Sequence, residues 1–331
     1  MQTMKAIVID EFGPPEVLQV RDLPVPEPGP GEALVRHEMI GVNFAETLMR
    51  RGLYHRGGPF KFPSQLGLEA AGRVAKLGEG VNLPDLKEGT RVAAVYRKPS
   101  AYAEYGVLPA EQLVPVPEDV PLEIAAAFPV QGMTAWYMLA EMHRTQPGET
   151  VLIHAVAGGV GLLAVQIAKH LGARVIGTTS SEEKAKRARE FGADDTIIYT
   201  EQDWVLEARR LTDMRGVDLI LDSVGKDTFD GGMKVLANFG HLILYGSASG
   251  TVGHMEPQLL MRGSHTVSGF WLHSVRERPD LILKASQAVL DLYRAGKLKF
   301  TIDEVFSFSE AARAHEKLEN RRSSGKLLLK P

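Results

Sequence analysis

The chain has no cysteine among its 331 residues. That absence excludes disulfide bonds, thiolate nucleophiles and every zinc site that uses sulfur ligands. The chain also lacks an excess of positive charge, because its formal net charge is −3 at pH 7. Without a basic field the protein cannot recruit nucleic acid or an anionic membrane surface electrostatically, so we expect neither partner.

No segment of the sequence has the composition of a membrane span. The longest apolar region, residues 151–172, contains His154, Lys169, His170 and four glycines. The apolar stretch at the N-terminus is too short for a signal peptide, and no small-residue cleavage site follows it. With 44% apolar and 24% charged residues the composition is that of a globular protein. We therefore expect a soluble cytoplasmic protein of about two domains.

Residues 4–115 have the pattern of a β-rich module. Short apolar runs are separated by proline and glycine, and the connector 24–31 contains too much proline for a helix. One short helix is expected over 44–51. The loop from Gly52 to Gly67 carries Tyr54 and His55, and long loops of this kind are often functional. Strands are expected over Met4–Asp10, Ala33–Val42, Ala70–Leu77, Arg91–Val95 and Ala101–Val107.

The pattern changes near Pro121. Residues 122–142 have helical spacing, interrupted by Pro129 and Gly132, and from Val151 strand-like and helix-like segments alternate. This alternation predicts a parallel sheet with helices on both faces. Strands are expected over Val151–Ala155, Arg174–Thr178, Thr196–Tyr199, Val217–Asp222 and Leu242–Tyr245, and helices over Gly161–Leu171, Glu182–Phe191, Gln202–Leu211 and Thr228–Ala237.

The last part of the chain is expected to complete the first domain. A long helix over 281–295 should end at Gly296, which is a favourable C-terminal cap. Ser307 and Glu310 have the spacing of a capping box for a helix that reaches Leu318. Strands are expected near 300–305 and over 326–329.

The segment 151–172 is the most informative part of the sequence. An apolar strand enters the turn Ala157-Gly-Gly-Val-Gly161, which opens directly into a helix. Backbone N–H groups and the helix dipole make such a turn a pocket for a dinucleotide pyrophosphate. The glycine pattern is incomplete, because Val156 stands where the first glycine is usual. The alternative is a tight turn that binds no ligand.

Residues at the end of the second strand favour NADP over NAD. NAD sites usually carry an Asp or Glu there for the ribose 2′-hydroxyl, whereas this strand ends in Thr178 and Thr179. Ser180 and Ser181 precede a helix, which is a natural anion site, and Lys184 lies one turn into it. The alternative is that Ser181 is a plain N-cap and Lys184 a solvated surface charge.

Several short motifs occur in order along the chain. They are Gly41-Val-Asn-Phe44, Arg51-Gly-Leu-Tyr54, Gly67-Leu-Glu-Ala-Ala-Gly72, Val130-Gln-Gly-Met-Thr-Ala135, the 157–161 turn, Asp222-Ser-Val-Gly225, Gly246-Ser-Ala-Ser-Gly250 and Gly325-Lys-Leu-Leu-Leu329. In this order they resemble the zeta-crystallin-like quinone oxidoreductases of the medium-chain dehydrogenase/reductase superfamily, and the likeness covers essentially the whole chain.

The resemblance implies an α/β protein with a GroES-like β-rich substrate domain, 1–122 with 267–331, and a Rossmann NADP-binding domain, 123–266. The cleft between them should hold NADPH, and a homodimer is implied. Contacts near the nicotinamide are expected from Asn43, Thr134 and Ser247 and the wall Phe270, Trp271 and Leu272. The pyrophosphate is expected at Ala157, Gly158, Gly159 and Val160, the 2′-phosphate at Thr179, Ser180, Lys184 and Tyr199, and a late arginine contact at Arg321 or its neighbour Arg322.

Zinc-dependent members of the superfamily use a cysteine and a histidine where this chain has Asn43 and Leu68. Neither residue can bind zinc as those ligands do. The ten histidines form no H-x₃-H pair or other compact ligand cluster. His37, His55 and His143 are expected on the surface or in packing, so we expect no catalytic metal.

Without a metal or an activated nucleophile, the simplest chemistry is direct hydride transfer from NADPH to a quinone or conjugated enone. Tyr54 is the candidate for orienting the acceptor carbonyl, with a packing role as the alternative. Asn43 is a second candidate catalytic residue, through the ribose or the substrate. No proton donor stands out, and solvent can serve. Two other functions stay open: an NADPH-dependent enoyl or alkenal double-bond reductase, and a non-catalytic NADPH-binding or RNA-associating crystallin-like protein.

Overall fold

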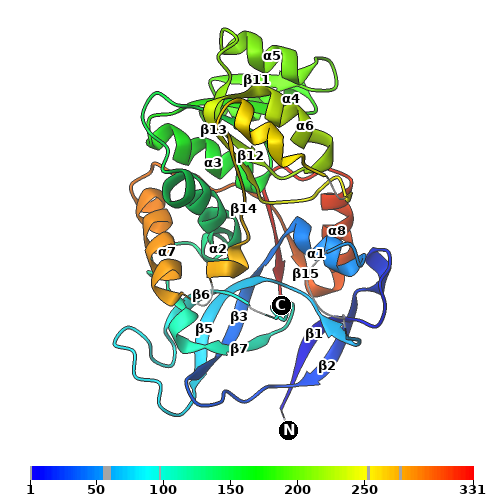
Figure 1. Cartoon of the computed structure of the whole chain (residues 1–331). Helices are drawn as coiled ribbons and strands as arrows, with labels where there is room; N and C mark the ends of the chain where they lie inside the picture. The colour runs from blue at the N-terminus through cyan, green and yellow to red at the C-terminus, as the bar shows by residue number, and fades with distance from the viewer. Residues whose placement is uncertain (1, 55–60, 97, 252–253, 276–277) are drawn as a thin grey trace. The chain divides into compact units, whose positions relative to one another are not determined.

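A computed structural model describes residues 2–54, 61–96, 98–251, 254–275 and 278–331, and it contains two compact units (Figure 1). Unit 1 consists of residues 1–130, 275–290 and 300–331, and unit 2 of residues 131–274 and 291–299. The chain passes from one unit to the other inside two of its helices, α2 (Leu122–Trp136) and α7 (Pro279–Arg294). Functional domain boundaries at residues 122 and 266 stay a prediction.

Unit 1 is built mainly from antiparallel strands in two sheets. The smaller sheet has the order β2-β1-β4, and the larger one has the order β15-β16-β3-β5-β6-β8, with β7 paired to β3. The strands are β1 (Thr3–Ile9), β2 (Gln19–Pro24), β3 (Glu32–Val42), β4 (Ser64–Gln65), β5 (Glu69–Leu77), β6 (Arg91–Val95), β7 (Tyr105–Pro109), β8 (Val114–Pro115), β15 (Ile302–Ser307) and β16 (Lys326–Lys330).

The C-terminal segment completes unit 1, as the sequence predicted. Strand β16 pairs antiparallel with β3, and Leu328 lies opposite Gly41. Helix α8 (Ala311–Glu319) follows a 3₁₀ turn, Phe308–Glu310, and the predicted capping box between Ser307 and Glu310 is present. Helix α7 ends at Arg294, and Gly296 has a φ of 69°, the left-handed conformation expected of a C-terminal cap.

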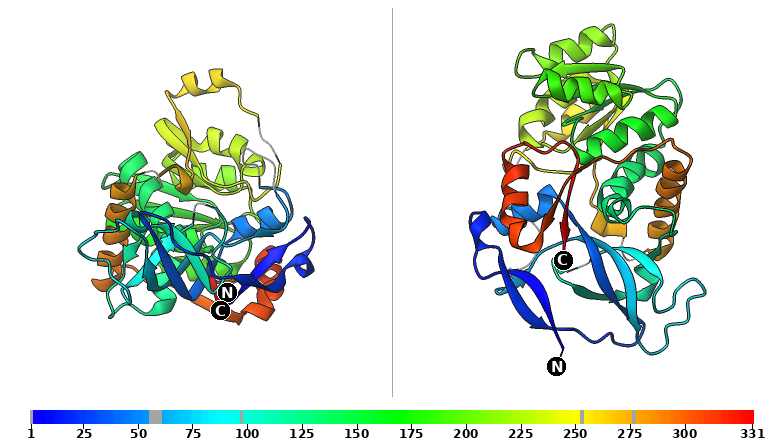
Figure 2. Two further views of the ribbon diagram at one scale, coloured as in Figure 1. Left: turned by 90° about the horizontal axis from the view of Figure 1, so that it is seen from below. Right: turned by 180° about the vertical axis from the view of Figure 1, so that it is seen from behind.

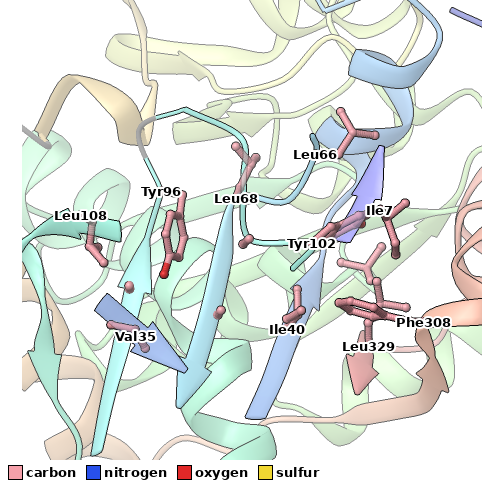
Figure 3. Packing of buried hydrophobic residues seen from close by; sticks show 14 of the residues in the cluster. Ile7, Val35, Ile40, Leu66, Leu68, Tyr96, Tyr102, Leu108, Phe308 and Leu329 are labelled. Carbon is pink, nitrogen blue, oxygen red and sulfur yellow. The ribbon is translucent and has the colours of Figure 1, made fainter. Parts of the chain in front are cut away.

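One hydrophobic cluster fills unit 1 with side chains that are far apart in the sequence (Figure 3). Ile7, Ile40 and Leu68 come from the N-terminal strands and the loop before β5, while Phe308 and Leu329 come from the last part of the chain. Burial of each such side chain stabilises the fold by roughly 1.5–3 kcal/mol. The C-terminal return is therefore part of the first core rather than an appendage.

Unit 2 contains a six-stranded parallel sheet of order β11-β10-β9-β12-β13-β14, with helices on both sides (Figures 1 and 2). Trp204 of α5 and Phe229 of α6 pack against a hydrophobic cluster of the sheet that includes Leu152 and Ile220. The strands are β9 (Thr150–Ile153), β10 (Arg174–Thr179), β11 (Asp195–Ile198), β12 (Val217–Asp222), β13 (Leu236–Leu244) and β14 (Thr266–Gly269), and the helices are α3 (Gly159–His170), α4 (Glu182–Glu190), α5 (Trp204–Leu211) and α6 (Lys226–Val235).

Three sequence predictions need correction. Pro129 does not interrupt α2, because the helix continues to Trp136 and is followed by a π-helical turn, Tyr137–His143. The helix expected to reach Ala237 ends at Val235, because Leu236 already pairs with Val217 as the first residue of β13. The strand expected over 101–107 forms only from Tyr105.

Among the described residues, no helix combines the length and the apolar character needed to cross a membrane.

Helix α1 (Phe44–Arg50) and the 3₁₀ turns Pro15–Val17, Ala110–Gln112, Pro257–Arg262 and Leu272–Val275 complete the secondary structure.

His37 is buried in unit 1, as the packing interpretation expected. Its Nδ1 lies 2.7 Å from the Ala103 carbonyl oxygen and its Nε2 lies 2.6 Å from the Tyr96 hydroxyl. Because the carbonyl oxygen can only accept, Nδ1 carries the proton and Nε2 accepts from Tyr96. Burial lowers the pKa of His37 to about 4, so the ring is neutral in the folded protein at pH 7.

This burial predicts an acid-sensitive stability. Between pH 6.5 and 4 the unfolded chain binds a proton on His37 that the folded chain does not, so the free energy of unfolding falls as the pH falls. The expected loss from pH 7 to pH 5 is about 2 kcal/mol for this residue. Urea unfolding at both pH values measures it. His37→Gln keeps one donor and one acceptor, and its stability should fall less than the parent's over this range; an equal fall would contradict the assignment.

Candidate functional site

The candidate cofactor site of unit 2 is the edge of the sheet at which all six parallel strands end. Strand β9 lies in the middle, and from it the chain continues outward through β10 and β11 on one side and through β12, β13 and β14 on the other. Ligands of open parallel sheets bind outside the carboxyl ends of the strands, at the point where the strand order reverses. In this sheet that point lies at the end of β9, which is the strand that leads into the glycine turn.

The glycine turn presents uncapped backbone N–H groups. Helix α3 starts at Gly159, and its N-cap, Gly158, has no side chain to accept from the first turn. A Cβ at Gly161 would lie 2.5 Å from the carbonyl oxygen of Val156, so only glycine allows the helix to approach the turn this closely. Gly159 lies against the Gln131 side chain. The predicted residues Ala157, Gly158, Gly159 and Val160 thus surround the positive end of a 12-residue helix.

The structure explains why this turn tolerates Val156 in place of the usual first glycine. The Val156 side chain is buried against Gly177 of β10, where any Cβ would collide with its methyl groups. The left-handed conformation that the turn requires falls on Ala155, whose φ is 51°. The glycine missing from the turn is therefore compensated by a glycine in the neighbouring strand and by one strained alanine.

Three residues predicted for the 2′-phosphate lie at or directly after the ends of β10 and β11, and the fourth lies in the helix that follows β10. Thr179 is the last residue of β10, and its carbonyl oxygen accepts from the backbone N–H of Tyr199 at 3.0 Å. The Ser180 carbonyl oxygen accepts from the Thr200 hydroxyl at 3.1 Å, and Lys184 lies in the first turns of α4. The two adjacent strand ends thus bring Thr179, Ser180, Lys184 and Tyr199 to one corner of the sheet.

One of the two carboxylates in the first turn of α4 is paired with an arginine. Ser181 is the N-cap of α4, since its Oγ accepts from the backbone N–H of Lys184 at 3.4 Å, as the alternative interpretation expected. The Glu182 carboxylate is paired with Arg189 further along the helix. The corner therefore offers hydroxyls, a helix N-terminus and a lysine to an anion, with the charge of Glu182 neutralised.

Ser247 and the segment Phe270–Leu272, which are predicted for the nicotinamide, follow strands on the other side of β9. Ser247 follows β13, and its loop packs on the loop after β12, where the backbone N–H of Ala248 donates to Ser223 at 3.0 Å. Phe270 follows β14 and stacks on Tyr137, with ring centroids 5.7 Å apart. Trp271 is exposed, Leu272 is buried, and Thr134 is buried on α2.

The three remaining predicted residues lie in unit 1. Asn43 is the N-cap of α1, and Tyr54 is partly buried against the hydrophobic cluster, a contact that supports its packing role. Arg321 follows α8 with a φ of 56°. Its N–H donates to Leu318 and that of Arg322 donates to Lys317, which is the hydrogen-bond pattern of a Schellman cap.

Asn43 belongs to a buried polar network that the sequence analysis did not identify. Its Oδ1 accepts from Lys326 Nζ at 2.7 Å, its Nδ2 donates to Glu69 at 2.8 Å, and Lys326 and Glu69 form an ion pair. Glu46 accepts from the backbone N–H groups of Asn43 and Leu68 at 2.8 and 3.0 Å. Asn43 and Glu46 have the spacing of a capping box, and that spacing was the available sequence signal.

Two features of this network explain local sequence choices. The second oxygen of Glu69 accepts from the backbone N–H of Val130 at 2.7 Å, directly after Pro129. A Cβ at Gly41 would collide with the Glu69 side chain and lie 2.7 Å from the Ala126 carbonyl oxygen. Burial raises the pKa of Glu46 to about 7, against the opposing charge of Lys326 and with the added repulsion of Glu69.

The residues at the positions of the superfamily's zinc ligands do not fit a zinc ion. The Leu68 side chain lies in the hydrophobic cluster (Figure 3). The oxygen and the nitrogen of the Asn43 amide are both hydrogen-bonded, to Lys326 and to Glu69. A zinc ion at this place would lie close to the positively charged ammonium of Lys326, which would repel it. Asn43 and Leu68 therefore do not form a zinc site.

The histidines occupy other places. His143 is half-buried, 3.3 Å from His241 between their Nδ1 atoms and 3.2 Å from Glu149, whereas His55 lies outside the described residues. In the part of the chain that the structure describes, no group of three His, Asp or Glu side chains has a metal-binding arrangement.

Comparison with known proteins agrees with this geometry. Residues 29–118 match the alcohol dehydrogenase GroES-like domain and residues 159–287 the zinc-binding dehydrogenase family model. A quinone oxidoreductase of Pseudomonas aeruginosa is 40% identical, covering 99% of both chains, and a 2-haloacrylate reductase of Burkholderia is 38% identical, covering 98% of both. The structure of Escherichia coli quinone oxidoreductase in complex with NADPH has a TM-score of 0.93 at 35% identity, covering 99% of this chain and 100% of that one.

The corner of the sheet with Thr179, Ser180, Lys184 and Tyr199 is called the 2′-phosphate corner. If it binds the 2′-phosphate, a charge change there should affect NADPH binding more than NADH binding. Lys184→Glu should weaken NADPH binding by roughly tenfold or more, because it replaces a charge-assisted contact by repulsion, and should weaken NADH binding far less. Titration of both cofactors by fluorescence measures the effect. Lys186→Glu, an equal charge change at an exposed position of the same helix, is the control. An equal loss for NADPH and NADH would mean that Lys184 does not touch the 2′-phosphate.

Because Arg321 lies in a Schellman cap, Arg321→Gly should weaken NADPH binding without lowering the stability of the protein. Glycine is the favoured residue for a φ of 56°, so the variant should keep its stability or gain about 1 kcal/mol while NADPH binding weakens. Urea unfolding and a cofactor titration give the two quantities. Arg322→Ala resolves the register: a loss of affinity in that variant alone would place the contact at Arg322.

Proposed function

The chain belongs to the medium-chain dehydrogenase/reductase superfamily and, within it, to the quinone oxidoreductase family, and from this premise we propose its function. It is a zinc-independent, NADPH-dependent oxidoreductase that transfers hydride to quinones or similar conjugated carbonyl acceptors. One observation carries this proposal. From β11 to β14 the strand ends carry the residues predicted for the 2′-phosphate, the pyrophosphate and the nicotinamide, which is the order of these parts in NADPH.

The chain's own residues bind and orient the cofactor. Lys184 and the N-terminus of α4 hold the 2′-phosphate, and the N–H groups of Gly159 and Val160 hold the pyrophosphate. Ser247 and the Phe270 to Leu272 segment flank the nicotinamide. The bound cofactor supplies the hydride for the acceptor. The protein contributes the alignment of the two reactants and the exclusion of water between them.

Tyr54 is proposed to donate a hydrogen bond to the acceptor oxygen on which negative charge develops. Its loop position and the family motif that contains it support this role. Solvent delivers the proton, because quinones and enones need little acid assistance once hydride has been added.

The acceptor class is tested by steady-state assays. NADPH oxidation is expected with 1,4-benzoquinone and 9,10-phenanthrenequinone, and at lower kcat/KM with an alkenal and an enoyl thioester. If no quinone supports NADPH consumption, the proposal is wrong.

A double-bond reductase is the second candidate, and the Burkholderia relative supports it, because that protein is named for reduction of a 2-haloacrylate. A kcat/KM that is higher for the alkenal or the enoyl thioester than for both quinones would favour this candidate. Both candidates use the same cofactor site and differ only in the acceptor.

Removal of the Tyr54 hydroxyl tests its role. Tyr54→Phe keeps the ring that packs on the cluster, and it should lower kcat by roughly tenfold or more while the Kd for NADPH is unchanged. Stopped-flow measurement of NADPH oxidation separates this effect from product release. An unchanged kcat would leave Tyr54 with the packing role.

We further propose a cytoplasmic homodimer. Strand β14 is the terminal strand of its sheet, and Phe239 and Met261 near it are exposed apolar side chains. An edge of this kind can pair with a second copy. A monomer mass by light scattering would contradict the dimer, and recovery of the protein outside the cytoplasmic fraction would contradict the location.

A further inference from the structure

Gly158 and Gly159, at the start of α3, leave room for different groups. Gly158 is exposed, and apart from its chain neighbours a Cβ added to it would have the Ala155 carbonyl oxygen as its nearest contact, at 3.1 Å. A Cβ added to Gly159 would lie 2.3 Å from Nε2 and 2.5 Å from Oε1 of Gln131. The space of a side chain at position 159 is therefore taken by the terminal amide of Gln131.

The Gln131 amide lies flat on the glycine turn. Its Cδ is also 2.5 Å from that Cβ position, so all three amide atoms are nearly equidistant from it and the amide plane faces Gly159. The N–H bonds of the amide lie in this plane and therefore run alongside the turn rather than into it. Both residues belong to unit 2, so the contact lies within one compact unit.

The amide is available to a ligand beside the turn. The Gln131 side chain is partly exposed, and no hydrogen bond joins its amide to any residue that the structure describes. An exposed amide without a protein partner keeps its full capacity to donate. Glutamine has no charge, so it can lie at the positive end of a helix without competing with an anion for that end.

The backbone of the turn alone offers few donors to a pyrophosphate. The N–H of Gly158 is already used, because it donates to the Ala155 carbonyl oxygen at 2.9 Å. The N–H groups of Gly159 and Val160 remain at the start of the helix. A pyrophosphate has more acceptor oxygens than these groups can satisfy, and a side-chain N–H that donates to an anion forms a charge-assisted bond.

We propose that Gln131 is a further cofactor-binding residue, whose amide nitrogen donates to the pyrophosphate of NADPH beside the N–H groups of Gly159 and Val160. The inference rests on the proposed function for the cofactor alone and requires no particular acceptor. Because the contact lies outside the 2′-phosphate corner, it contributes equally to the binding of NADPH and NADH. Glycine at position 159 is then needed for the cofactor in a second way, since a side chain there would displace the amide.

The test compares fragments of the cofactor. The fragment 2′-AMP has the 2′-phosphate without the pyrophosphate, and 2′-phospho-ADP-ribose has both but lacks the nicotinamide. Dissociation constants are measured by displacement of fluorescent NADPH. Gln131→Met keeps the length of the side chain without a donor, and it should bind 2′-phospho-ADP-ribose and NADPH roughly five- to tenfold more weakly than the parent. Its affinity for 2′-AMP should stay within about twofold of the parent's.

Two further variants change the charge at the same position. Gln131→Glu has the same size and replaces the donor by an anion, so its loss for 2′-phospho-ADP-ribose should exceed that of Gln131→Met. Gln131→Lys returns a donor with a positive charge, and it should bind this fragment at least as tightly as the parent, with a stronger dependence on salt. The matched control is Gln146→Met, which removes a glutamine amide before the start of β9 and should bind every fragment as the parent does.

Three outcomes overturn the inference: a Gln131→Met variant that binds 2′-phospho-ADP-ribose as the parent does, an equal loss for 2′-AMP, and a loss for NADPH alone. The second would indicate a structural defect, and the third would place the amide at the nicotinamide. Unfolding midpoints establish that each variant is folded. If the parent oxidises NADPH with quinones while one of these outcomes holds, the inference alone fails. If the parent binds the fragments as expected but oxidises no NADPH with any quinone, the proposed function fails instead.

Discussion

The ion pair between Lys326 and Glu69 is the interaction on which the arrangement of unit 1 depends. It joins the C-terminal strand β16 to the start of β5, and through Asn43 it joins both to the N-terminus of α1. Charges buried this deeply are stable only with partners and hydrogen bonds. Glycine at position 41 and the N–H that follows Pro129 are then local consequences, because each makes room for or donates to Glu69.

A second constraint governs unit 2: a parallel sheet places every strand end at the same edge. Gly158, Lys184 and Phe270 are distant in the sequence, but they therefore lie along the same edge of the sheet. Steric detail adjusts this edge, since Val156 is tolerated only because Gly177 in the adjacent strand has no side chain to oppose it. The cofactor site is thus a property of the sheet's topology, refined by local packing.

Much of the fold could be predicted from local patterns, and the errors have physical causes. Apolar runs and glycine caps identified the strands and helices of unit 2, and the capping box at Ser307 was confirmed. Helix α2 was misjudged at Pro129, because tertiary packing carries the helix past the residue that a local rule treats as a break. The start of β13 was misjudged because Leu236 pairs with Val217, a partner that no local window contains.

By itself, the sequence determined the class of the fold, the glycine turn and the lack of cysteine and histidine at zinc-ligand positions. These features are written in residue types and short spacings. The tertiary structure was needed to show that Lys326 meets Asn43 and Glu69, and that the Asn43 amide nitrogen faces two carboxylates, those of Glu69 and Glu46. The reason is physical: hydrogen-bond capacity depends on which groups are brought within bonding distance, and here Lys326 is separated from both of its partners by more than 250 residues of chain.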